Sequence, residues 1–133
     1  MPQYVYAAPT VMLALRWPMD ELDQRIAQRT RLMFDQGLVE ETRELDRSGL
    51  RDTKTAAKAT GYAQALAVID GDMTIPEAID SVALATRQLA RRQLKWLRRD
   101  PRIVWIDRSI EGTSTSAEAA LLTARRVVLS VLQ

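Results

Sequence analysis

The sequence of 133 residues contains no cysteine and no histidine. The absence of cysteine excludes disulfides, thiolate nucleophiles and cysteine-ligated zinc or iron–sulfur centres. The absence of histidine removes the commonest general base and the commonest metal ligand. Any chemistry must therefore come from Asp, Glu, Lys, Arg, Tyr, Ser or Thr, or from a cofactor or partner.

Long apolar runs are also absent. No segment approaches the roughly 18 apolar residues that a membrane-spanning helix needs. Residues 1–4 lack the basic start of a secretory signal, and the apolar run 11–15 is short and followed by Arg16. We therefore expect a cytoplasmic protein with no membrane partner, and we interpret the run as a strand.

What is present fits one modest folded region. The chain has 47% hydrophobic and 27% charged residues, which predicts a single globular region over 1–133. The net charge of +2 is small, but the cations are clustered: residues 87–102 hold seven of the nineteen basic residues and one acid, Asp100. The distribution of charge is therefore more informative than its sum.

Hydrophobic periodicity and helix-boundary residues predict a mainly α fold with two short strands. Pro18 opens a helix that Gly37 ends, and Gly49 ends the next helix. Thr74 with Glu77 forms a capping box at the start of the longest helix, which Pro101 ends. The expected strands cover about 10–17 and 102–107, and the expected helices about 18–36, 38–48, 55–69, 75–99 and 117–131. The inward-facing residues expected are Leu22, Ile26 and Met33, then Leu38, Thr42 and Leu45, and finally Ala120, Leu121, Ala124, Val128 and Val131.

The two strands pose a problem for a chain of this size. Both are near-continuous apolar runs, which is typical of strands buried on both faces of a sheet. Two strands alone make a marginal sheet in water. We therefore expect this chain to be the C-terminal piece of a larger α/β protein or to complete its sheet against another chain; the alternative is local pairing under the helices.

The helix expected over 75–99 separates apolar from basic residues. On a helical wheel with about 100° per residue, each set occupies its own arc. We expect the apolar arc, including Trp96, to face the core. The apolar arc holds Ile75, Ile79, Val82, Thr86, Leu89, Gln93, Trp96 and Leu97; the basic arc holds Arg87, Arg91, Arg92, Lys95, Arg98 and Arg99.

Like charges at i,i+4 destabilise a helix slightly unless an anion offsets them. Phosphate is a suitable anion for the residues of the basic arc, because the planar guanidinium group of arginine can donate two hydrogen bonds to phosphate oxygens. Nucleic acid is therefore our leading interpretation of the basic arc. A solvated basic face and an acidic protein partner are the alternatives.

Two further arginines, Arg25 and Arg29, stand one turn apart on the first helix. Arg29 lies within about 40° of Leu22 and Met33 on the wheel, which predicts a position at the core edge. An arginine there needs an anion, either a carboxylate or a bound phosphate. Glu40 and Glu41 are the candidate carboxylates.

Four blocks of sequence resemble the tRNA dimethylallyltransferase family, also called tRNA isopentenyltransferases. In chain order, they lie within 22–41, at Gly61-Tyr62, over 86–98 and at 104–107. The resemblance covers nearly all of the chain and corresponds to the C-terminal two fifths of such an enzyme. It implies a P-loop α/β fold with a helical insertion, whose phosphate-binding loop and acidic general base lie in the N-terminal half. This sequence contains no Gly-x-x-x-x-Gly-Lys-Ser/Thr.

The resemblance implies transfer of a dimethylallyl group from dimethylallyl diphosphate to the exocyclic amine of the adenosine 3′ of the tRNA anticodon. It implies Mg²⁺ bound by the missing N-terminal half, which would be a partner of this piece, and a tRNA anticodon stem-loop as the other partner. The isolated chain is expected to be inactive; a non-catalytic helical module that binds RNA or another partner, and a purely structural helical domain, are the alternatives. Arg29, with Arg25 beside it, resembles the family's diphosphate-binding arginine, and the resemblance assigns tRNA contacts to Lys58, Gly61, Tyr62, Arg87, Arg91, Arg92, Lys95 and Arg98.

Overall fold

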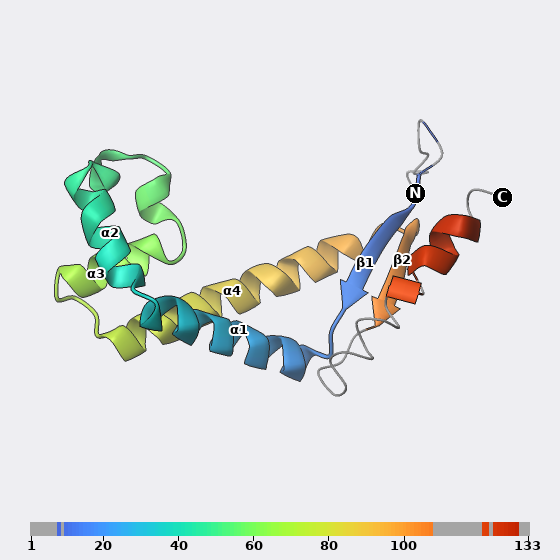
Figure 1. The fold of residues 1–133 in the computed structure, drawn as a ribbon, viewed down its shortest axis with the longest axis horizontal. Coiled ribbons are helices and arrows are strands. Elements are labelled where there is room, and N and C mark those ends of the chain that lie inside the picture. Colours follow the sequence, from blue (N-terminus) through green and yellow to red (C-terminus); the bar gives the residue numbers. More distant parts are fainter. Residues whose placement is uncertain (1–7, 9, 108–120, 123, 131–133) are drawn as a thin grey trace. The chain divides into compact units, whose positions relative to one another are not determined.

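The fold is mainly helical, with two short strands (Figure 1). The structure is a computed structural model that describes residues 8, 10–107, 121–122 and 124–130. The predicted fold class is confirmed, and the chain divides into two compact units, Met1–Leu22 with Arg92–Gln133, and Asp23–Arg91. The elements are β1 (Met12–Arg16), α1 (Met19–Asp35), α2 (Leu38–Arg47), the 3₁₀ turns η1 (Leu50–Asp52) and η2 (Ala56–Lys58), α3 (Tyr62–Ile69), α4 (Ile75–Leu97) and β2 (Ile103–Asp107).

In the first unit, β1 and β2 pair with each other in parallel and lie side by side in Figure 1. Met12 is in register with Ile103, and Arg16 with Asp107. Ile103 and Ile106 are buried, but Leu15 of β1 is 50% exposed. The expectation that both strands are buried on both faces is therefore wrong for β1, because the described residues supply two strands and no cover for this face.

The second unit has a core built by four helices. Phe34, Leu38, Ala65, Ala78 and Val82 form its buried cluster, to which α1, α2, α3 and α4 each contribute. The two alanines, Ala65 of α3 and Ala78 of α4, are fully buried in this cluster.

Two predicted inward faces are correct in part: Ile26 of α1 and both Leu38 and Thr42 of α2 are buried as predicted. In α1 the buried side chains are Ile26, Thr30 and Phe34, whereas Met33 is exposed. Thr30 is buried at no cost in hydrogen bonds, because its hydroxyl donates to the Ile26 carbonyl at 2.8 Å. In α2, Leu45 is likewise exposed. A helical wheel gives the angle of each residue around the helix axis, but it does not show which of two neighbouring faces packs against the rest of the protein.

The expected helix over 55–69 is wrong in its first half. Residues 56–58 form η2, and the α-helix begins only at Tyr62. Gly61 precedes it with φ +103°, a conformation that residues with a side chain rarely adopt. A Cβ at Gly61 would meet only a Leu38 methyl group at 4.0 Å, so it is the backbone conformation and not a lack of space that requires glycine.

The capping box of α4 is confirmed. The Thr74 N–H donates to Glu77 Oε2 at 2.8 Å, and the Glu77 N–H donates to Thr74 Oγ1 at 3.3 Å. The backbone N–H and hydroxyl of Thr74 hold the pKa of the Glu77 carboxyl below its usual value. The helix then runs to Leu97, a few residues before Pro101.

Part of the last predicted helix is described. Residues 121, 122 and 124–130 are helical, but Leu121 and Val128 are exposed, so their predicted inward position is wrong. Ala120 and Val131, also predicted to face inward, lie outside the described residues.

Candidate functional site

The cations of α4 and of the turn directly after it, called the α4 row below, are the main feature that the sequence singled out. Arg87 is half-buried, and the basic side chains that follow it are exposed. Among the described residues, one of these cations forms an ion pair, Arg91, whose Nη2 lies 2.9 Å from Asp23 Oδ2 of α1. No ion pair joins the others to a described carboxylate: Arg87, Arg92, Lys95, Arg98 and Arg99. The row is thus largely available to an external anion.

The Asp23–Arg91 pair leaves one polar atom unsatisfied. Asp23 Oδ1 is buried and has no hydrogen-bond partner among the described residues. Removing Arg91 would leave the whole carboxylate uncompensated, so Arg91 contributes to the packing of α1 on α4 whatever else it binds. Arg91 is therefore a weaker probe of ligand binding than its neighbours in the row.

The arginines of α1 do not lie where the wheel predicted. Arg29 is exposed, and so is Arg25, so the core-edge position expected for Arg29 is wrong. The carboxylates suggested for it have other partners: Glu40 pairs with Arg43 at 3.4 Å, and Glu41 accepts a hydrogen bond from Tyr62. Arg29 thus makes no ion pair with a described carboxylate.

The segment before α3 combines an exposed lysine with a constrained turn. Lys58 ends η2 and is exposed. The Gly61 N–H donates to Gln64 Oε1 at 2.8 Å, which fixes the start of α3. Tyr62 packs against the buried cluster, and its hydroxyl donates to Glu41 Oε1 at 3.3 Å. Tyr62 therefore has a structural role, and of the three residues singled out here Lys58 is the one fully open to a ligand.

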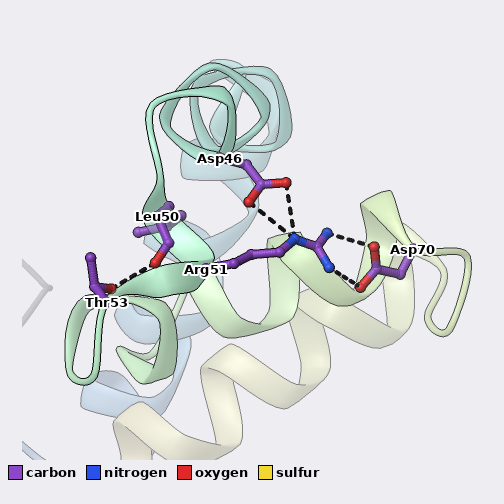
Figure 2. Close-up of polar contacts among 5 residues, drawn as sticks. All are labelled: Asp46, Leu50, Arg51, Thr53 and Asp70. Atoms are coloured by element: carbon purple, nitrogen blue, oxygen red, sulfur yellow. Dashed lines mark hydrogen bonds and ion pairs between the residues drawn. The ribbon is translucent and has the colours of Figure 1, made fainter.

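A clamp centred on Arg51 was missed by sequence reasoning. Figure 2 shows its guanidinium between two carboxylates: Nε lies 2.9 Å from Asp46 Oδ2, and Nη2 lies 2.5 Å from Asp70 Oδ1. The hydrogen bonds to Asp70 and Asp46 raise the pKa of Arg51, and Arg51 holds the pKa of the Asp70 carboxyl below its usual value. Nearby, the Thr53 hydroxyl donates to the Leu50 carbonyl at 2.7 Å. The clamp ties the ends of α2 and α3 beside the segment that carries Lys58.

A cleft in the other unit lies where both strands end. It has a volume of about 380 Å³. Arg16 Nε lies 2.6 Å from Asp107 Oδ1 and keeps the pKa of the Asp107 carboxyl low, while the Arg16 guanidinium carbon lies 5.4 Å from the centre of the Trp105 ring. The lining residues are Arg16, Trp17, Pro18, Met19, Leu94, Arg98 and Asp107. Arg98 is thus the member of the row that borders a cleft.

Neither a metal centre nor a membrane span is found in the described part of the chain. No three Asp or Glu side chains there come close enough to hold a metal ion. The Mg²⁺ that the family resemblance implies is expected in the N-terminal half of the enzyme, and it stays a prediction. No described helix is both long and apolar enough to cross a membrane.

Comparison with known protein families assigns this mainly helical chain to a class of transferases. The model of the family described as IPP transferase matches residues 2–100, and this chain belongs to that family. Among curated proteins, it is 50% identical over 107 residues to the tRNA dimethylallyltransferase of Pseudarthrobacter chlorophenolicus, which covers 80% of this chain and 36% of that protein. It is 49% identical over 110 residues to the same enzyme of Corynebacterium jeikeium, covering 83% of this chain and 36% of the relative.

Solved structures agree with this assignment. The full-length tRNA isopentenylpyrophosphate transferase of Bacillus halodurans superposes with a TM-score of 0.74 at 31% identity, covering 89% of this chain and 39% of that one. The tRNA delta(2)-isopentenylpyrophosphate transferase of Staphylococcus epidermidis gives 0.67 at 26% identity, over 73% and 32% of the two chains. The chain thus spans little more than a third of the length of the proteins that it matches, and the predicted family is confirmed.

Proposed function

We propose that this chain is the tRNA-binding C-terminal part of an enzyme that transfers a dimethylallyl group from dimethylallyl diphosphate to tRNA. The acceptor is the exocyclic amine of the adenosine 3′ of the anticodon, and the enzyme acts in the cytoplasm. The observation that carries the proposal is the row of exposed cations on α4. Family membership supports it independently.

The row supplies what binding of an anticodon stem-loop requires. RNA phosphates are held by cations, and each neutralised phosphate releases counterions and makes the affinity depend on salt. An adenosine is modified only after it leaves the base stack, so the protein must hold a distorted loop. We assign this role to Arg87, Arg91, Arg92, Lys95 and Arg98, with Lys58 and the turn at Gly61 and Tyr62 as a second contact.

Arg29 and Arg25 are assigned to the diphosphate of the donor. Arg29 is exposed and has no carboxylate partner among the described residues, which favours an external anion. A guanidinium beside the departing diphosphate would stabilise the charge that develops there. The P-loop motif is absent from this sequence, so we expect the isolated chain to bind RNA without transferring the prenyl group.

The RNA-binding proposal is tested by the salt dependence of affinity. Fluorescence anisotropy should show binding of a labelled anticodon stem-loop, with log affinity falling linearly as log salt rises. Arg92→Ala should reduce the steepness of this line by about one unit. Arg47→Ala, which removes an exposed arginine at the end of α2, is the matched control and should leave the line unchanged. A wild-type affinity that does not depend on salt would contradict the proposal.

The assignment of Arg29 needs a catalytic context. A chimaera can carry this chain in place of the matching region of the Pseudarthrobacter chlorophenolicus enzyme. Arg29→Ala should then raise KM for dimethylallyl diphosphate far more than KM for the stem-loop. Arg31→Ala, an exposed arginine on the same helix, is the control. A rise confined to the KM for RNA would reassign Arg29 to the tRNA.

A further inference from the structure

Trp96 is the most exposed aromatic side chain in the described part of the chain. It lies in the last turn of α4 and is 69% exposed, although its place in the apolar arc predicted a core position. The half-buried residues at this end of α4 are Leu94 and Leu97. At about 100° per residue, Trp96 is turned roughly 160° from Leu94 and 100° from Leu97, so its indole points away from the covered side.

Two cations flank this indole, one on α4 and one in the turn that follows it. Arg92 precedes Trp96 by one turn, and Arg99 follows it by three residues, so both are its neighbours on the helix surface. The Arg99 N–H donates to the Trp96 carbonyl at 3.2 Å, which continues the turn beyond Leu97. Neither Arg92 nor Arg99 makes an ion pair with a described carboxylate. An exposed aromatic ring thus stands beside free cations within a single compact unit.

We propose that Trp96 stacks on an unpaired base of the RNA whose phosphates the α4 row holds. Single-stranded nucleic acids are bound by this combination, in which cations follow the backbone and an aromatic ring takes the face of a base. Single-stranded RNA has phosphates that the cations can bind and flat bases on which the Trp96 indole can stack, so it matches both the charged and the aromatic part of this surface. The inference rests on the proposed function. It adds a stacking contact with a base to the ionic contacts with the phosphates.

Stacking and charge are separated by how each variant changes the affinity and its salt dependence. Trp96→Ala should weaken binding of the stem-loop by roughly tenfold and leave the slope against salt unchanged, because no cation is lost. Trp96→Phe should recover most of the affinity. Leu121→Ala removes a side chain of similar exposure (71%) from the same unit and should have no effect. Circular dichroism confirms that each variant is folded.

The stacked base is identified by a double-mutant cycle. Each loop nucleotide is replaced in turn by an abasic one, and binding is measured with wild type and with Trp96→Ala. At one position the two losses should not add, because the second change removes a contact already gone. Fully additive losses at every position would overturn the inference.

The remaining outcomes are also decisive. Unchanged affinity of Trp96→Ala, or an equal loss in Trp96→Phe, would overturn stacking and leave the RNA-binding proposal intact. A flatter salt slope in Trp96→Ala would show that Trp96 acts by placing cations instead. If wild type binds an acidic protein and no stem-loop, the proposed function fails, and the stacking role fails with it.

Discussion

The Arg51 side chain connects two helices of the second unit, α2 and α3. Its guanidinium bonds a carboxylate at the end of α2 and another directly after α3, with two hydrogen bonds to each. Exposed ion pairs are usually weak, but the bidentate pair with Asp70, together with the Nε–H that is shared between both oxygens of Asp46, makes this arrangement stronger than an isolated pair. The partners stand 5 and 19 residues away in sequence, so no local spacing rule identifies them.

The clamp predicts a pH dependence with a definite sign. Because Arg51 lowers the pKa of Asp70 in the folded state, this interaction stabilises the fold above the ordinary Asp value of 3.8 and is lost as the pH falls through the lower folded value. The urea midpoint of wild type should exceed that of Arg51→Met near neutral pH. The difference should shrink as the pH is lowered from about 6 to about 3.

The control for this measurement is Arg47→Met, which removes an exposed arginine with no carboxylate partner among the described residues. Its difference from wild type should stay small at every pH. A difference between wild type and Arg51→Met that persists unchanged at low pH would contradict the assignment to carboxylate pairing.

Elements were predictable where a boundary is encoded by local chemistry. Thr74, Glu77 and Pro101 set the limits of α4 within a few residues, and the apolar runs located both strands. Faces were less predictable. Trp96 is exposed although it shares an arc with buried Val82, and the two residues belong to different compact units. A single wheel drawn over 23 residues cannot distinguish the surroundings of the two ends of a helix.

The capping box of α4 predicts a measurable loss of stability. Thr74→Ala removes the hydroxyl that accepts the Glu77 N–H, and should cost about 1 kcal/mol in the free energy of unfolding. Thr55→Ala is the matched control, since Thr55 precedes η2 without a side-chain capping bond. Urea denaturation measures both. Equal losses in the two variants would mean that the capping bond contributes nothing specific.

At the scale of the whole molecule, the sequence was enough to predict the family, but it was not enough to predict which side chains are exposed and which are packed. The blocks at 22–41, 61–62 and 86–98 identify the family because their order and spacing can be determined from the sequence without knowing how the helices pack. The exposure of Arg29 and the burial of Tyr62 against the core depend on contacts between distant segments. Contacts between distant segments produce no periodic pattern in the sequence from which they could be predicted.

The two units should differ in local stability. The described residues give the first unit a two-stranded sheet with an exposed face on β1, a marginal arrangement in water, whereas Ala78, Val82 and Ala83 of α4 are packed in the second unit. Local opening follows the number of buried apolar contacts, so β1 amides should exchange hydrogen at least about tenfold faster than those of 78–83. Hydrogen exchange read by mass spectrometry measures both.

A core variant distinguishes local from global opening in that experiment. Val82→Ala should destabilise the second unit by about 2 kcal/mol and speed exchange at Ala65 and Leu66, which belong to the same packed region. Exchange in β1 should stay unchanged, because its amides already open without unfolding that core. If β1 is protected as strongly as α4, or if Val82→Ala accelerates both to the same degree, then the strands open only when the whole chain unfolds.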